Sequence, residues 1–223
     1  MNFLACLPLI NSDIPAVLSL DQRCLGGLWT KSGYQRELES DCSDLLVIVS
    51  TADPHLLGQR QALKALPTEQ QTTEQTIVQQ TALAAKDPAD SIGSDLLLLG
   101  VGCLWAILEE AHITTLAVEP SYQGHKLGQL LLTELLLCAH RRGLTRATLE
   151  VRQSNHRALK LYQKFDFKTA GMRKRYYSDG ENACILWRGG LKSEAALQQI
   201  TQQQRAAIAQ LTTANHLPYP SLF

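Results

Sequence analysis

The sequence predicts an α/β fold with a central mixed β-sheet flanked by helices on both faces. Segments of strand character alternate with helical periodicity through the second half of the chain, which implies parallel neighbours. Short polar breaks at 109–110 and 178–181 separate apolar segments and indicate hairpins, hence antiparallel neighbours. The 223 residues suffice for one large domain, and a sheet with both kinds of pairing fits them.

The first elements are a strand, two helices and a second strand. Residues 2–10 have strand character, and the polar residues 11–13 can cap a helix that follows them. Its apolar positions recur every third or fourth residue, at Ile14, Val17, Leu18 and Leu25. A second helix is predicted over 34–40. Residues 44–50 are short, β-branched and continuously apolar, which is typical of a buried strand.

Residues 52–94 differ in composition from the rest of the chain. Seven glutamines and five threonines fall between residues 59 and 81, and no Phe, Trp or Tyr occurs from 35 through 104. A segment with so few anchoring side chains is predicted to be an inserted, partly disordered loop, with a weak helix near 74–86. We interpret it as a surface excursion, because polar low-complexity composition rarely carries a function of its own.

The remaining elements follow at regular spacing. Strands are predicted over 96–108 and 111–119, and a leucine-rich, largely buried helix over 127–142, closed by Gly143. A strand over 145–152, a helix over 155–165 and a hairpin of 167–177 with 183–188 come next. A polar helix after 189–190 completes the chain. We therefore predict one domain over 1–189, with the insertion at about 52–94, and a helical extension over 190–223.

Composition excludes several classes of protein. Twenty-one basic and 21 acidic residues give no net charge, which argues against binding nucleic acid through its phosphates. Six scattered cysteines form no CxxC pair and no Cys/His cluster, so neither a disulfide framework nor a metal site is expected. The leading segment has no basic residue before Arg23, and the longest apolar run spans 13 residues. We expect a soluble cytoplasmic protein without a membrane partner.

The sequence TLAVEPSYQGHKLGQLLL, residues 115–132, carries the most informative local pattern. A strand ends before Pro120, and a loop with Gly124 and Gly128 opens directly onto the leucine-rich helix. Free N–H groups and the positive end of the helix dipole make such a junction suitable for a phosphate. An ordinary tight turn would give the same pattern, so the residues alone leave both interpretations open.

Spaced motifs across the chain resemble the GNAT superfamily of N-acetyltransferases. Residues 123–128, QGHKLG, resemble its Gln/Arg-x-x-Gly-x-Gly/Ala signature. LEVRQSNHRALKLYQKFDF (149–167), RKRYYSDGENA (173–183) and GLWTKSGYQREL (27–38) resemble the RimI type, the ribosomal-protein alanine N-acetyltransferases. Two positions depart from the family. Lys126 replaces a loop glycine, so the loop either holds a left-handed residue without glycine or has another shape; Asp166 replaces the glycine after a helix, where aspartate is tolerated.

The resemblance implies the fold of that family and acetyl-CoA as cosubstrate, with no metal. Main-chain groups of Leu116, Ala117 and Val118 would pair with the pantetheine arm like an added strand, and the loop and first helical turn would receive the diphosphate. The amide of Asn155 would hold the pantetheine, although an Asn at a helix start also serves as an N-cap. The predicted cofactor-binding residues of this loop and turn are Gln123, Gly124, His125, Lys126, Leu127, Gly128 and Gln129, and those from Gly124 to Gln129 would receive the diphosphate.

Two side chains are predicted to be catalytic by the same resemblance. Glu150, on the polar face of its strand, would be the general base, and Tyr162 would be the general acid that returns a proton to the coenzyme A sulfur. The alternatives from the residues alone are a solvated charge at Glu150 and a core tyrosine at Tyr162. His112 and His125 receive no catalytic role.

The predicted acceptor is the N-terminal amine of a protein, most plausibly the N-terminal alanine of a small-subunit ribosomal protein. A terminal amine has a pKa of about 7.7–8.0 and lysine about 10.4, so a carboxylate base deprotonates the former more easily. The alternatives are a GNAT enzyme with another acceptor, a lysine or a small amine, and a non-catalytic coenzyme A-binding module. The sequence leaves the oligomeric state open.

Overall fold

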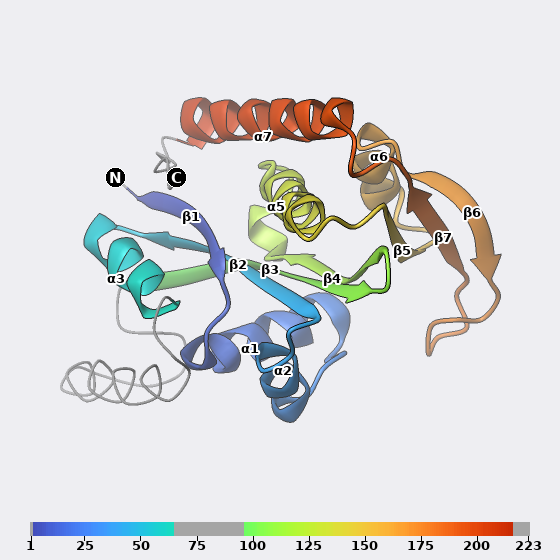
Figure 1. The fold of residues 1–223 in the computed structure, drawn as a ribbon. Coiled ribbons are helices and arrows are strands. Elements are labelled where there is room, and N and C mark those ends of the chain that lie inside the picture. The colour runs from blue at the N-terminus through green and yellow to red at the C-terminus, as the bar shows by residue number, and fades with distance from the viewer. Residues whose placement is uncertain (1, 65–95, 216–223) are drawn as a thin grey trace.

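The computed structural model describes residues 2–64 and 96–215, and these form a single mixed sheet with helices on both faces (Figure 1). The described strands follow the order β1-β2-β3-β4-β5-β7-β6, and among them only β4 and β5 pair in parallel. The predicted fold class is confirmed. The strands are β1 (Phe3–Pro8), β2 (Ser43–Thr51), β3 (Leu96–Ile107), β4 (Glu110–Val118), β5 (Arg146–Arg152), β6 (Lys168–Arg173) and β7 (Ala183–Arg188).

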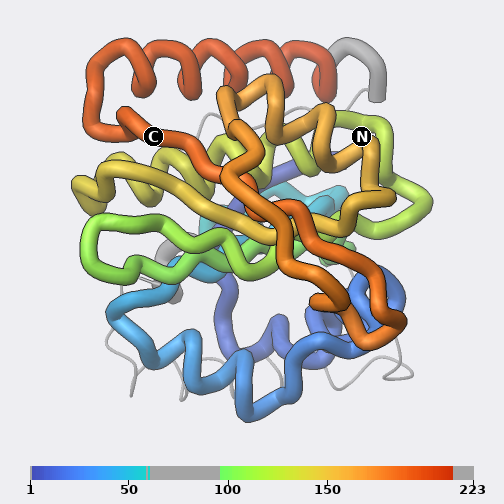
Figure 2. The backbone as a smooth tube through the Cα atoms, turned by 90° about the vertical axis from the view of Figure 1, so that its right-hand side faces the viewer, coloured from blue at the N-terminus to red at the C-terminus, as the bar shows by residue number. Residues whose placement is uncertain are grey.

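Helices cover the sheet from two sides (Figures 1 and 2). One layer consists of α1 (Ile14–Leu25) and α2 (Lys31–Leu38); the other contains α5 (Leu127–Arg141), α6 (His156–Lys164) and α7 (Glu194–Asn215). Strand β2 shows why its sequence is continuously apolar. Leu46 and Ile48 pack in the core cluster of α5, while Val47 and Val49 pack in that of α1, so both faces are buried.

Helix α5 lies very close to the sheet at its centre. A Cβ atom added at Gly102 of β3 would meet Leu135 Cδ1 at 3.0 Å and Leu131 Cγ at 3.1 Å. Leucines 130, 131, 132, 135 and 136 are all fully buried, which confirms the predicted buried helix. This packing fixes the start of α5 relative to the end of β4, where the candidate site lies.

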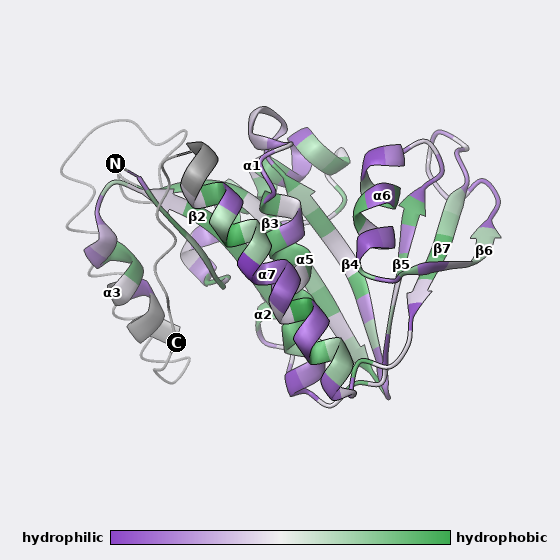
Figure 3. Cartoon of the chain, turned by 90° about the horizontal axis from the view of Figure 1, so that it is seen from above, coloured by the Kyte–Doolittle hydropathy of each residue, from purple (hydrophilic) through white to green (hydrophobic). Residues whose placement is uncertain are grey.

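The predicted C-terminal helix is confirmed, and α7 packs against α5 over much of its length (Figure 3). Ile200 and Leu211 are fully buried in the same core cluster as α5. The polar side chain of Gln204 donates a 2.6 Å hydrogen bond to Glu134 of α5. Although its composition is polar, α7 therefore contributes buried side chains to the main core.

The prediction of a loop from residue 52 onward is wrong for its first part. Residues 54–64 form α3 (Pro54–Lys64), which contacts β1 and β2. Leu57 is buried in the core, and Arg60 forms a buried ion pair with Asp13. The apolar and charged anchors of α3 are few, so composition alone did not reveal them. The predicted weak helix over 74–86 lies outside the described residues.

Helix beginnings differ from the sequence predictions at two points. α2 begins at Lys31, three residues early, because the Thr30 hydroxyl accepts a hydrogen bond from Gly33 N. Residues 11–13 form a short 3₁₀ helix, and Asp13 is the N-cap residue of α1, as predicted, but its side chain accepts from Ile10 N at 3.0 Å and makes no capping bond to α1. Lys126 and Asp166 both adopt left-handed backbone, with φ of 68° and 59°. For Lys126 this is the first of the two predicted alternatives, a left-handed loop residue other than glycine.

Candidate active site

The parallel strands β4 and β5 pair at one end and diverge at the other. Their register runs from Glu110 with Arg146 to Ile113 with Leu149 and stops there. Beyond this point β4 continues to Val118 beside β3, and β5 continues to Arg152 beside β7 (Figure 3). The second half of β4 therefore presents an edge that does not pair with β5. We call this opening the β4–β5 fork.

Main-chain groups on the fork edge of β4 alternate in direction. Glu119 N donates to Leu99 O of β3, so by the period of an antiparallel ladder Ala117 also bonds to β3. Leu116 and Val118, rather than Ala117, thus offer main-chain groups to the fork. Val118 O already accepts from Gln123 Nε2 at 3.1 Å and from Cys24 Sγ at 3.4 Å.

The loop that leaves β4 leads directly into the first turn of α5. Gly124 has a φ of +94°, and Lys126, the N-cap of α5, has a φ of 68° with no side-chain capping bond. The first N–H groups of a helix lack intrahelical acceptors, so those of Leu127, Gly128 and Gln129 are free to bind an anion. A Cβ atom at Gly128 would make only ordinary contacts, the nearest being Leu161 at 3.7 Å.

The side chains of this loop and of the first turn of α5 differ in exposure and in their contacts. His125 is exposed, and its Nδ1 lies 3.3 Å from Tyr122 O. Leu127 is buried, and Gln129 donates to Gln203 O and Oε1 of α7, both at 3.2 Å. A diphosphate here would therefore meet main-chain N–H groups rather than the side chains of Leu127 and Gln129, in agreement with recognition through the backbone.

Glu150 projects from β5 at the position where the two strands separate. Its side chain is only 10% exposed and pairs with His112 Nε2 at 3.3 Å and Arg173 NH2 at 3.0 Å. His112 Nδ1 lies 3.0 Å from the Thr148 hydroxyl, which donates to Glu110 at 2.7 Å. The carboxylate thus stands at one end of a polar chain across β4 and β5, and is not a solvated surface charge.

Sequence reasoning missed the partners of Glu150. His112 received no role because it is isolated in the sequence, and Arg173 was noted only within a longer motif. Alternation along β4 puts His112 on one face of the sheet, but which residue of β5 it meets depends on the parallel register of the pair. That register follows from the fold, so the contact had no local sequence signal.

Tyr162 lies on the buried side of α6. Its ring packs edge-on against Phe167 with centroids 5.7 Å apart, and burial raises the pKa of its hydroxyl above the ordinary value. Tyr177, after β6, interacts electrostatically with Tyr162, and Glu150 contributes to raising the pKa of Tyr177 after the larger effect of burial. Tyr177 therefore belongs to the electrostatic surroundings of both predicted catalytic residues, and the sequence analysis assigned it no role of its own.

Asn155 is the N-cap of α6. Its Oδ1 accepts a hydrogen bond from Ala158 N at 3.0 Å, which is the simpler of the two alternatives that the sequence left open. The Nδ2 group is not used by this cap. Contact of that amide with a pantetheine arm stays a prediction.

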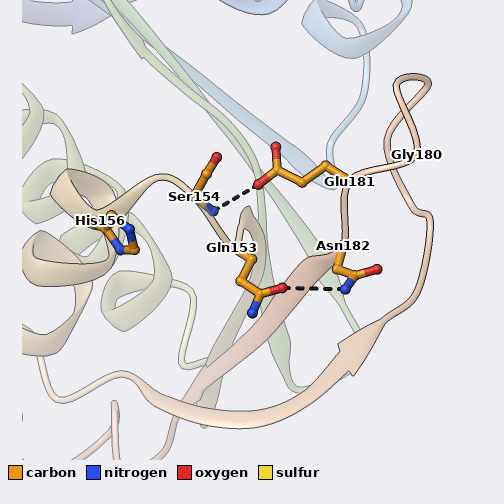
Figure 4. Close-up of a pocket in the computed structure, with 6 residues that line it drawn as sticks. All are labelled: Gln153, Ser154, His156, Gly180, Glu181 and Asn182. Atoms are coloured by element: carbon orange, nitrogen blue, oxygen red, sulfur yellow. Dashed lines mark hydrogen bonds between the residues drawn. The ribbon is translucent and has the colours of Figure 1, made fainter.

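A shallow polar hollow lies between the β5–α6 turn and the hairpin that joins β6 to β7 (Figure 4). Glu181 accepts from Ser154 N and Arg152 NH1, both at 2.8 Å, and Asn182 donates to Gln153 at 3.3 Å. These bonds fasten the hairpin to the β5–α6 turn. The hollow has no connection to the loop before α5, so we assign it a structural role.

Within residues 2–64 and 96–215, no group of three or more His, Cys, Asp or Glu side chains could hold a metal ion. None of the helices in those residues is long and apolar enough to cross a membrane.

The candidate site thus combines a divergent parallel strand pair, a loop at a helix start and a largely buried carboxylate on β5. Residues 59–167 match the sequence profile of the acetyltransferase (GNAT) family. Over these residues the chain is similar to that family, whose acetyltransferases use acetyl-CoA.

Among the relatives, the putative [ribosomal protein bS18]-alanine N-acetyltransferase of Bacillus subtilis is 40% identical over 97 residues, 43% of this chain and 64% of that protein. The [ribosomal protein bS18]-alanine N-acetyltransferase of Escherichia coli K12 is 39% identical over 82 residues, 36% of this chain and 55% of that protein. The matched part of the chain therefore spans less than two thirds of either relative.

Solved structures share the fold. The ribosomal-protein-S18-alanine N-acetyltransferase from E. coli superposes with a TM-score of 0.56 at 22% identity, covering 85% of this chain and 94% of that one. Ard1 from Thermoplasma volcanium gives a TM-score of 0.58 at 19% identity, covering 84% and 97%. At these identities the likeness supports the fold alone.

Proposed function

We propose that this chain transfers the acetyl group of acetyl-CoA to the N-terminal α-amine of a protein, and that its acceptor is the N-terminal alanine of ribosomal protein bS18. One observation carries the proposal: Glu150 stands on β5, the strand that leads to α6, at the point where the β4–β5 fork opens. The relatives named as bS18-alanine N-acetyltransferases supply the acceptor.

The residues present fit acetyl-CoA. Leu116 and Val118 offer main-chain groups along the fork, and the N–H groups of Leu127, Gly128 and Gln129 suit a diphosphate. Gly124 in the loop and Gly128 in the first turn of α5 carry no Cβ that would come between the backbone and a ligand. When bound, acetyl-CoA supplies the activated acetyl thioester.

Glu150 would remove a proton from the acceptor ammonium, directly or through a water molecule. Its two oxygens contact His112 and Arg173, yet a carboxylate offers about four acceptor positions, so room remains for an amine donor. His112 and Arg173 hold the carboxylate in one orientation. A positioned base of this kind typically contributes 10²–10⁴-fold in rate.

Tyr162 would donate a proton at its hydroxyl to the leaving sulfur. Burial raises its pKa, so the phenol is protonated throughout the neutral range and can act as an acid. Glu150 and Tyr162 then act on opposite sides of the transfer, one taking a proton from the nucleophile and one giving a proton to the leaving group.

The test is an acetylation assay with acetyl-CoA and a synthetic peptide that carries the N-terminal sequence of bS18 from the same organism. We expect release of free thiol and a mass gain of one acetyl group at the α-amine. A peptide with a blocked N-terminus and one internal lysine is the matched control and should not react. Reaction of the lysine peptide alone would assign the chain to a different acceptor.

A further inference from the structure

Arg157 lies over the loop at the start of α5, although it belongs to α6. Its NH1 group donates a 3.2 Å hydrogen bond to Gln123 Oε1, and its NH2 group would lie 2.9 Å from a Cβ atom added at Gly124. Gln123 in turn donates to Val118 O at the end of β4. The pair Gln123–Arg157 therefore bridges the mouth of the β4–β5 fork.

The charge of Arg157 has no counterpart in the protein as described. Arginines such as Arg23, Arg142 and Arg152 pair with carboxylates within 2.8 Å, whereas Arg157 forms no ion pair with any residue in 2–64 or 96–215. Its only described hydrogen-bond acceptor is a neutral amide oxygen. A guanidinium retains donors in a planar fork, and an anion is the partner that such a fork prefers.

The surroundings of Arg157 carry further positive charge and no nearby carboxylate contact. Lys126 is partly exposed at the N-cap of α5, beside the free N–H groups of the first turn, where the helix dipole is positive. Gly124, with its φ of +94°, lets the guanidinium lie directly against the loop backbone. A larger residue there would hold Arg157 away.

We propose that Arg157 is a cofactor-binding residue that clamps the diphosphate of coenzyme A from the α6 side, opposite the N–H groups of α5. The inference rests on the proposed function and adds a contact from a second helix. Binding of the diphosphate replaces the neutral acceptor Gln123 with a charged one, so the Arg157 guanidinium exchanges its bond to Gln123 for one to the ligand.

The test measures the affinity of the full chain for coenzyme A and for dephospho-coenzyme A, which retains the diphosphate and lacks the 3′-phosphate, by titration calorimetry at low salt. Arg157→Ala is expected to weaken both ligands by about 10-fold, Arg157→Lys by less, and the difference from wild type should shrink as salt is added. Arg205→Ala, which removes an exposed arginine on the outer side of α7, is the matched control and should leave both affinities unchanged.

Each contrary result has a defined meaning. Loss of affinity for coenzyme A alone would assign Arg157 to the 3′-phosphate and overturn the diphosphate contact. Unchanged affinity in Arg157→Ala would remove it from the site. Failure of the wild-type chain to bind either ligand would instead refute the proposed function.

Discussion

Gln199 on α7 donates a 2.7 Å hydrogen bond to Asp166 in the turn directly after α6. The same side chain accepts a 2.8 Å hydrogen bond from Arg188, which is 4% exposed at the end of β7. Asp166 has a φ of 59° and stands where the resembling sequences have glycine. A glycine would adopt this left-handed backbone without strain, but only the aspartate can accept the hydrogen bond from the C-terminal helix. Through this bond α7 holds the end of α6, the helix that bears Tyr162.

This relationship predicts coupled effects on stability. Asp166→Gly should change the free energy of unfolding by less than about 1 kcal/mol, because relief of left-handed strain offsets the lost hydrogen bond. Gln199→Ala should cost about 1–2 kcal/mol, since it leaves the Arg188 donor buried without its acceptor. In the Gln199→Ala background, Asp166→Gly should become stabilising by about 1 kcal/mol. Urea unfolding of the four chains measures the coupling, and strictly additive effects would contradict it.

A second prediction concerns Glu150. Glu150→Gln removes the proton acceptor and retains the shape, so kcat with the bS18 peptide should fall by about 100-fold or more. Affinity for coenzyme A should stay the same, because the free edge of β4 and the start of α5 do not involve this side chain. Steady-state kinetics and calorimetry together check both halves.

Glu110→Gln provides the matched control for Glu150→Gln. Glu110 belongs to the same polar chain, but it lies beyond Thr148 and His112 and pairs with Arg146 at 2.7 Å. Its removal should alter kcat by less than about 5-fold if proton transfer takes place at Glu150. Equal losses in the two variants would assign the effect to the network as a whole and not to one base.

Much of this site could be predicted from the sequence because its main parts are local. The loop at 123–128 and the following helix are contiguous, and Glu150 and Tyr162 belong to one strand and the helix after it. The periodicity of a single segment is enough to place such residues on a face. The same holds for β2 and β3, whose continuously apolar patterns reflect burial on both sides.

The contacts of the site that the sequence analysis did not predict join residues that are distant in the sequence. Arg157 reaches Gln123 across 34 positions, and His112 meets Glu150 only through the parallel register of two strands. The same is true of α7, whose glutamines look solvated in sequence yet bond to Glu134 and Gln129. Composition reports the average environment of a segment, and it cannot report which partner a single polar side chain meets.

A third prediction concerns the pH dependence of the reaction. Burial raises the pKa of Tyr162 above its ordinary value of about 10, and an acid must be protonated to act. A raised pKa keeps the acid active at higher pH, so the rate at saturating substrates should not decline between pH 8 and pH 10. Tyr162→Phe should lower kcat by about 10²-fold or more at every pH in this range. A wild-type rate that falls to about half by pH 10, with the fall absent in the variant, would indicate an acid of ordinary pKa.

The last prediction concerns the buried ion pair of Arg60 on α3 with Asp13, which ties α3 to the start of α1. Arg60→Met leaves the Asp13 carboxylate buried without its cation, and should cost about 3–5 kcal/mol in unfolding free energy at neutral pH. The double variant Asp13→Asn/Arg60→Met should recover much of that loss, because the amide oxygen can still accept from Ile10 N.

The pH dependence of Arg60→Met has a definite sign. Burial raises the pKa of Asp13 to about 6 even with Arg60 present, and removing the cation raises it further. The folded chain then holds a proton that the unfolded chain releases above about pH 4, so folding stability falls as the pH rises from about 4 through the folded-state pKa. Arg60→Met should therefore be closest to wild type near pH 4 and should deviate most at pH 7, in urea unfolding followed by circular dichroism. A destabilisation independent of pH over this range would show that Arg60 acts by packing alone.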